Sequence, residues 1–263
     1  MYESDIEQLA IELLEEQGYS YLSPEECEAE RGDLSVVILR QRIKAAIDKL
    51  NPTVPADARE QALRVVSNLP TQNLIENNEA FHSMLTDGVD VEYMSEHGVK
   101  GDKVWLIDFA NPSNNEFIVC NQFTVLQGTA NKRPDVVLMV NGLPLAVIEL
   151  KNPADENATV KKAFTQLQNY KHAIPQLFYY NGLLIASDGI DAKVGSLTAD
   201  WSRFMAWKTS DGSKEDKVTV PQIETVIRGL LRPEILLDII KQFTVFEKTK
   251  KEPKFEVRRK NRC

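Results

Sequence analysis

The sequence has little cysteine and no long apolar run, and both absences exclude classes of protein. Its three cysteines, Cys27, Cys120 and Cys263, are too few and too scattered for a disulfide framework or a zinc site. No run approaches the roughly 20 apolar residues that cross a bilayer. The amino terminus is acidic where a signal peptide carries basic residues. We therefore expect a soluble cytoplasmic protein with no membrane contact.

Several catalytic motifs are also missing. No glycine is followed by lysine and no two glycines have G-x-G spacing, so the phosphate loop of ATPases and the dinucleotide fingerprint are absent. The elbow of serine hydrolases and the zinc-protease motif are absent too, and the three histidines lie far apart. Any ATP-driven activity must therefore reside outside this chain.

The composition that remains is that of a globular protein. The chain has 263 residues, 43% of them hydrophobic, which suits one elaborated domain or two small ones. Its formal charge of −8 is unevenly placed, with ten acids and no lysine or arginine in 1–30, and eight basic residues against two acids in 248–263. We interpret 247–263 as a solvated basic linker, and the chain as a fragment cut before another domain.

The periodicity of apolar residues predicts both helices and strands. Helical spacing is expected before Gly18, after Ser23, over 38–50, and at about 55–68, 72–85, 159–174, 221–231 and 233–246. Strands are expected over 104–109, 117–120, 123–126, 135–140, 143–150 and 182–187. We therefore predict an α/β domain over 1–246, in which helices flank a mixed sheet. It comprises a helical elaboration (1–90), an α/β core (100–190) and C-terminal helices (220–246).

One group of charged residues falls on consecutive predicted strands. Asp135 begins one strand, and Glu149 and Lys151 end the next, two residues apart and therefore on one face. Charged groups at the end of a buried strand are costly without a partner or a metal. Two converging carboxylates suit Mg²⁺, and the lysine can position an attacking water or offset charge on a phosphate.

The turn between these strands tests that hypothesis. A two-residue loop at Asn141-Gly142 places Asp135 opposite Ile148, so that Asp135 and Glu149 leave opposite faces of the sheet. A three-residue loop with Gly142 as the left-handed residue, or a bulge, restores a shared face. The metal hypothesis therefore requires an odd loop or a bulge here.

The pattern Pro134-Asp135 followed by Glu149-x-Lys151 resembles the PD-(D/E)xK nuclease superfamily. In that family the two acids hold the metal and the lysine serves catalysis. Gln166 and Tyr170, one helical turn apart, match the Q-x-x-x-Y element of one branch, whose members support the site or contact nucleic acid. A third acid from the first helix often joins the metal, and Glu7 is the candidate here, with Glu3 and Glu12 as alternatives. Glu7 also fits a capping box with Ser4, which we favour.

Longer stretches narrow the resemblance. The segments RPDVVLMVNGLPLAVIELKNP, AFTQLQNY, NQFTVLQG and IEQLAIELLEEQGY resemble the amino-terminal region of the R (motor) subunit of type I restriction enzymes, over about 5–245. The resemblance implies a Mg²⁺-dependent endonuclease domain that cleaves double-stranded DNA after ATP-driven translocation by a motor outside this chain. It also implies methyltransferase (M) and specificity (S) subunits as partners, and a linker toward the helicase motor at 247–263.

Two rival interpretations remain open. One is a non-catalytic module that docks the motor onto the methyltransferase, with Asp135, Glu149 and Lys151 forming a structural ion-pair cluster. The other is a stand-alone repair or resolvase nuclease of the same superfamily, which would cut branched or damaged DNA without ATP.

Overall fold

The computed structural model describes residues 3–152, 159–251 and 254–261, and it describes side chains over 4–152 and 159–247. Its helices are α1 (Glu3–Glu16), α2 (Pro24–Arg31), α3 (Arg40–Leu50), α4 (Ala56–Ser67), α5 (Leu74–Asp87), α6 (Val160–Ala173), α7 (Pro175–Phe178), α8 (Gln222–Thr225) and α9 (Pro233–Gln242), with the 3-10 turns η1 (Pro112–Asn114) and η2 (Trp201–Arg203) and the π-helical turn η3 (Val226–Leu230). Its strands are β1 (Ser20–Leu22), β2 (Val89–Ser95), β3 (Gly98–Val104), β4 (Phe117–Asn121), β5 (Val125–Gln127), β6 (Ala130–Lys132), β7 (Val136–Val140), β8 (Leu143–Leu150), β9 (Leu183–Ser187), β10 (Ala192–Gly195), β11 (Thr244–Lys251) and β12 (Lys254–Asn261).

The central sheet is mixed, which confirms the predicted α/β class. Its strand order is β1-β4-β7-β8-β9-β10. The pairs β1–β4 and β8–β9 are parallel, and the other neighbouring pairs are antiparallel. Every residue of β7, β8 and β9 is buried, as expected for strands covered on both faces.

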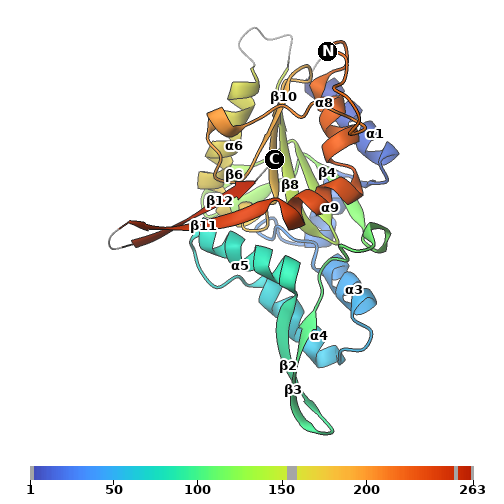
Figure 1. The fold of residues 1–263 in the computed structure, drawn as a ribbon, viewed down its shortest axis with the longest axis vertical. Helices are drawn as coiled ribbons and strands as arrows, with labels where there is room; N and C mark the ends of the chain where they lie inside the picture. The colour runs from blue at the N-terminus through green and yellow to red at the C-terminus, as the bar shows by residue number, and fades with distance from the viewer. Residues whose placement is uncertain (1–2, 153–158, 252–253, 262–263) are drawn as a thin grey trace.

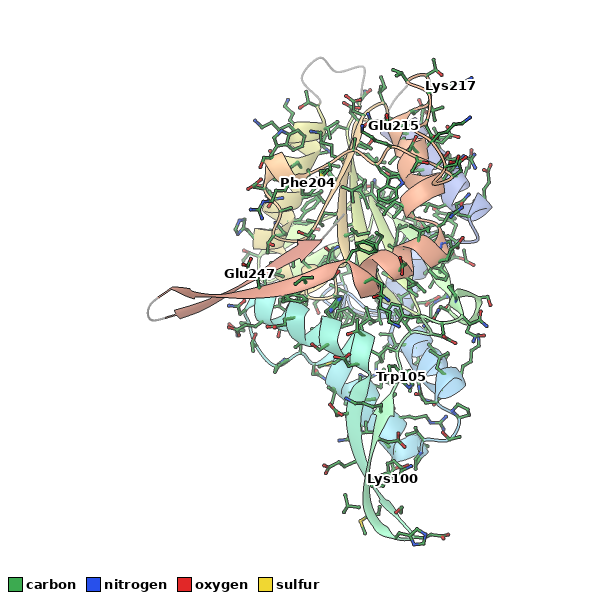
Figure 2. All side chains as sticks on the ribbon, in the orientation of Figure 1. Lys100, Trp105, Phe204, Glu215, Lys217 and Glu247 are labelled. Atoms are coloured by element: carbon green, nitrogen blue, oxygen red, sulfur yellow. The ribbon has the colours of Figure 1, made fainter. Side chains whose placement is uncertain are left out.

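Helices cover both faces of this sheet. Figure 1 shows α6 on one side and α1 with α8 on the other, and the contacts of α6 with β8 and β9 and of α1 with β1 and β4 agree. Helices α3, α4 and α5 form a separate group toward one end, from which the β2–β3 hairpin projects. Figure 2 shows Lys100 on this hairpin and Trp105 at its base, whereas Phe204 lies beside α6, where its ring packs on Phe164. Within the described ranges, no helix has the length and apolar character that a membrane crossing requires.

Most predicted helices are confirmed, because their end signals act locally. Ser23 caps α2 in a full capping box with Glu26, and Pro24 occupies the first helical position. Gly18 follows α1 with a φ of 93°. Helices α3 to α6 lie where the apolar spacing places them.

The strand expected over 104–109 is wrong. Only Val104 is in a strand, as the last residue of β3. Beyond it, asparagine side chains satisfy the backbone in place of a neighbouring strand. Asn51 accepts from the N–H of Trp105 (2.8 Å) and donates to its carbonyl (2.9 Å), and Asn141 donates to the carbonyl of Leu106 (2.9 Å). Leu106 and Ile107 are therefore buried without being in a strand, whereas Trp105 is 43% exposed.

The β2–β3 hairpin and the short strands β1 and β10 were not predicted. The first 100 residues are therefore not helical throughout, and β1 joins the central sheet beside β4. Strands of three and four residues are too short to give a clear alternation of apolar and polar side chains.

The carboxy-terminal end also differs from prediction. The helix expected over 233–246 ends at Gln242, and β11 begins two residues later. Most of 247–263, the segment interpreted as a basic linker, pairs as the antiparallel strands β11 and β12. The division at 246 between a domain and a linker stays a prediction.

Cys27 and Cys120 are buried with their sulfur atoms 3.3 Å apart, while Cys263 lies outside the described residues.

Candidate functional site

A bulge in the β7–β8 hairpin decides where the predicted site residues lie. The turn is a two-residue loop in which Asn141 and Gly142 have φ values of 53° and 84°, the pattern of a type I′ turn. Val140 then pairs with Leu143 and Met139 with Pro144, but Leu138 pairs with Ala146, so Leu145 is an extra residue. Proline has no N–H to donate to the hydrogen-bond ladder, and a bulge is one of the few places where a strand tolerates it.

This bulge confirms the backbone requirement of the metal hypothesis. Beyond it, Val136 pairs with Ile148, and the same register places Asp135 opposite Glu149. Residues directly opposite each other on neighbouring strands share a face of the sheet. Without the extra residue Leu145, the two acids would lie on opposite faces.

Asp135, Glu149 and Lys151 come together at the open end of the hairpin. Asp135 accepts a hydrogen bond from the backbone N–H of Leu150 through Oδ2 (2.7 Å). Lys151 donates to Oε1 of Glu149 (2.8 Å) and to the carbonyl of Leu150 (2.7 Å). Its own N–H donates to the carbonyl of Ser187 on β9 (2.9 Å), which fixes the backbone just after β8. The three predicted residues therefore form one cluster.

Both acids are buried, and the setting of Glu149 disfavours the charge of its carboxylate. Asp135 is 7% exposed and Glu149 is 2% exposed. Burial, and next the neighbouring charge of Asp135, raises the pKa of Glu149 to about 8, and the ion pair with Lys151 opposes this rise. Oε2 of Glu149 is buried with no hydrogen-bond partner among the described residues. Two neighbouring carboxylates thus lie at this end, and the ion pair of Lys151 is with Glu149.

These features fit a divalent cation. A buried carboxylate oxygen with no hydrogen-bond partner is costly, and each such atom in a native protein calls for an explanation. Hard cations such as Mg²⁺ bind through one or two carboxylates together with water and phosphate oxygens. Asp135 and Glu149 are the donor set that this structure offers. Across the residues that the structure describes, no three His, Cys, Asp or Glu side chains are placed to hold one ion together.

Helix α6 places Tyr170 beside the acids, and Gln166 forms a hydrogen bond with Tyr170. Thr159 caps the helix by accepting from the N–H of Lys162, and Tyr170 is buried on the face toward the sheet. Its hydroxyl donates to the carbonyl of Arg133 (3.3 Å), two residues before Asp135. Burial, and next the charge of Glu149, raises the pKa of Tyr170, and a hydrogen bond with Gln166 opposes this rise. Tyr170 is therefore both a core residue and a neighbour of the site.

Glu7 lies apart from the two acids, and its predicted capping box with Ser4 is wrong. Ser4 lies inside α1, which begins at Glu3. The Glu7 side chain turns toward the sheet and is 9% exposed, with both oxygens accepting hydrogen bonds from the carboxamides of Asn121 and Gln122. A distant partner has displaced the local one. A role for Glu7 in metal binding stays a prediction.

Other neighbours of the site were missed. Gln122 donates its backbone N–H to the carbonyl of Asp135 (2.8 Å). On the β9 side, Glu149 pairs with Ala186, and Ala186 pairs with Lys193 on β10. These paired positions place Lys193 on the same face of the sheet as Glu149. The Lys193 ammonium lies 4.4 Å from the centre of the Trp201 ring. The segment NQFTVLQG, which contains Gln122, carries only a family resemblance. Lys193 has no signal in the sequence, because the four-residue strand β10 is not predicted.

Comparisons with known proteins agree with the predicted relationship. A family model of the type I restriction enzyme R protein N terminus matches residues 1–203. The type I restriction enzyme HindI endonuclease subunit of Haemophilus influenzae is 39% identical over 254 residues, which cover 94% of this chain and 24% of that protein. The putative MjaIXP endonuclease subunit of Methanocaldococcus jannaschii is 32% identical over 93% of this chain and 26% of that protein. The chain thus spans about a quarter of the length of these two relatives.

Proposed function

This chain belongs to the type I restriction enzyme R protein N-terminal family, and from that premise we propose that it is a Mg²⁺-dependent nuclease domain. Its substrate would be the phosphodiester backbone of double-stranded DNA. The observation that carries the proposal is the buried pair Asp135 and Glu149, which meet on one face with one unpartnered carboxylate oxygen and Lys151 beside them. The relatives' names as endonuclease subunits support the same activity.

Each site residue has a defined task in this proposal. Asp135 and Glu149 would hold the cation, which when bound supplies positive charge against the negative charge that develops on the phosphate and the leaving 3′ oxygen. Lys151 would position the attacking water in line with the leaving oxygen and offset charge at phosphorus. Its ion pair with Glu149 orients the ammonium beside the acids. Gln166 and Tyr170 would support the acids from α6 or contact the nucleic acid.

The wider setting is also part of the proposal. Cleavage in the intact enzyme would follow ATP-driven translocation of DNA by motor domains, and it would require methyltransferase and specificity subunits. ATP would serve only those motor domains, because no Gly-Lys phosphate-binding loop occurs in this chain. The formal charge of −8 favours weak DNA affinity for the chain alone, with recognition provided by partners.

Cleavage by variants of the assembled enzyme tests the proposal. Mg²⁺- and ATP-dependent cutting of a plasmid carrying the recognition site is compared for the unaltered enzyme, Lys151→Ala and Lys100→Ala. We expect Lys151→Ala to lower the cleavage rate by roughly 10²–10³-fold, the scale for removing a preorganised charge-stabilising group. ATP hydrolysis should persist, because the motor is separate.

Lys100→Ala is the matched control, since Lys100 lies on the projecting β2–β3 hairpin (Figure 2), where it pairs with the exposed Asp102. This variant should cut DNA at the unaltered rate. Equal cleavage by Lys151→Ala would remove the catalytic assignment and favour a docking module. Cutting of branched DNA without ATP would instead favour a stand-alone nuclease.

A further inference from the structure

Glu7 is held by two neutral amides from the end of β4. The side-chain nitrogen of Asn121 donates to Oε1 of Glu7 (2.6 Å), and that of Gln122 donates to Oε2. Tyr21 on β1 donates its hydroxyl to the carboxamide oxygen of Asn121 (2.9 Å), which orients that amide. The Glu7 carboxylate on α1 is therefore bound through both oxygens, to the last residue of β4 and to the residue that follows it.

The backbone of Gln122 makes this arrangement possible. Consecutive side chains of a strand leave opposite faces, so two neighbours do not ordinarily reach one carboxylate. Gln122 has a φ of 48°, a left-handed conformation that is uncommon outside glycine. This conformation ends the alternation, so that the amides of Asn121 and Gln122 both reach Glu7. A strained residue held by defined contacts calls for a functional explanation.

The same residue also holds the backbone of Asp135. The N–H of Gln122 donates to the carbonyl of Asp135 (2.8 Å), and the N–H of Phe123 donates to the carbonyl of Pro134 (3.0 Å). Gln122 thus connects Glu7 on one side with Asp135 on the other. The position of the Asp135 carboxylate relative to Glu149 depends on this end of β7.

We propose that Asn121 and Gln122 are positioning residues, which fix the Asp135 end of β7 against α1 through Glu7. Glu7 acts through these two amides and not as a cation ligand. Its oxygens already accept from two donors, and across the described residues it forms no three-acid group with Asp135 and Glu149. This inference rests on the proposed function, because it concerns how the same pair of acids is held.

Exchange of the two interacting groups tests this inference. Gln122→Glu places a second acid against Glu7, and Glu7→Gln places an amide against two amide donors. We expect either change to lower the Mn²⁺ affinity, measured by calorimetry on the intact protein without DNA, by about 10-fold or more, the scale for losing a group that orients a ligand. The Mg²⁺-dependent cleavage rate should fall with it.

The double variant Glu7→Gln with Gln122→Glu separates positioning from ligation. The amide introduced at position 7 can donate to the carboxylate introduced at position 122 and can accept from Asn121. We therefore expect the double variant to recover most of the lost Mn²⁺ affinity and cleavage. If Glu7 binds the cation directly, the double variant will stay as weak as Glu7→Gln, and the inference is overturned.

Three further variants keep the outcomes distinct. Gln72→Glu makes the same chemical change at an exposed position and should leave the affinity unchanged. Gln122→Gly keeps the left-handed backbone and removes the amide, so it should also weaken Mn²⁺ binding, even if Gln122→Glu does not fold. Unaltered affinity in Gln122→Gly would overturn the inference.

Asp135→Asn tests the proposed function itself. If this variant binds Mn²⁺ and cleaves DNA like the unaltered protein, the proposed function fails. If Asp135→Asn is inactive but Gln122→Glu binds Mn²⁺ and cleaves DNA normally, only the positioning role is overturned.

Discussion

The two ends of the β7–β8 hairpin are built on opposite principles. At the turn, the backbone N–H and the side-chain amide of the buried Asn141 have hydrogen-bond partners. Its backbone and side chain exchange hydrogen bonds with Glu116, and its amide donates to Leu106 and Asn115, all within 2.9 Å. At the open end, Asp135 and Glu149 are equally buried, yet one oxygen of Glu149 has no hydrogen-bond partner among the described residues.

From this difference we interpret the turn as serving stability and the open end as holding the proposed cation site. The turn uses the neutral amide of Asn141 to bond neighbouring backbone groups and a glycine to allow the positive φ, so it contributes to stability and fixes the register. The open end holds two acids near one lysine, which costs stability unless a cation is supplied. Variants at the two ends should therefore separate activity from stability.

The largest expected effect is the loss of cleavage at the open end. Glu149→Gln keeps the size of the side chain and removes its charge, so the cleavage rate should fall by roughly 10²–10³-fold. Without divalent cations and above pH 8, where the Glu149 carboxyl is charged, its melting temperature should be at least that of the unaltered protein, because a repulsive buried charge has been removed. Plasmid cleavage and thermal melting provide the two measurements. A melting temperature well below that of the unaltered protein would contradict the view of this end as strained.

The turn should show the opposite result. Gly142→Ala should lower the free energy of unfolding by about 2–4 kcal/mol, because of the positive φ and the buried contact. The added Cβ would lie 2.6 Å from the carbonyl oxygen of Leu39. Urea denaturation measures the loss. Gly128→Ala is the control, since Gly128 also has a positive φ but has open space around it. Equal losses for both variants would show that strain, and not the Leu39 contact, sets the cost.

Added cation should sharpen the comparison further. Mg²⁺ at about 100 times its dissociation constant should raise the free energy of unfolding by about 2.7 kcal/mol. Asp135→Asn should abolish this gain while the Asn side chain still accepts from the Leu150 N–H. Gly142→Ala, if it folds, should keep the gain. Urea denaturation with and without Mg²⁺ gives the values, and stabilisation of Asp135→Asn equal to that of the unaltered protein would place the cation elsewhere.

The smallest expected effect is at Tyr170. Tyr170→Phe removes the hydroxyl, which donates to the carbonyl of Arg133 (3.3 Å) and forms a hydrogen bond with Gln166, and it keeps the buried ring. We expect a loss of stability of about 0.5–1.5 kcal/mol and a modest fall in cleavage. Tyr179→Phe is a matched control on the following segment, where the side chain is partly exposed. A fall in cleavage as large as that of Glu149→Gln would give Tyr170 a direct role in the reaction.

Elements with local signals could be predicted from the sequence. The capping box at Ser23, the apolar stripe of 159–174 and the continuous apolar runs of 135–140 and 143–150 all lie where predicted. The conformation of 104–109 could not be predicted, because Asn51 and Asn141 form hydrogen bonds with its backbone from elsewhere in the chain. The capping box predicted for Glu7 was wrong for the same reason, since its partners Asn121 and Gln122 are more than 100 residues away in the sequence.

For the site, the sequence could supply the residues but not their arrangement. Asp135, Glu149, Lys151, Gln166 and Tyr170 were all identified from their spacing and from a family resemblance. The structure brings the first three into one cluster with Tyr170 beside it, and Gln166 contacts Tyr170. Gln122 carries its signal in a backbone angle, which no residue type at that position would have revealed.

The sequence by itself determined which groups the proposed site contains: two acids and a lysine at the ends of two strands, and a helix that carries Gln166 and Tyr170. The tertiary structure decided whether the acids could meet. Strand side chains alternate with a period of two, so a single extra residue changes the face on which all later residues lie. That residue is Leu145, and its bulge forms only when β7 pairs with β8.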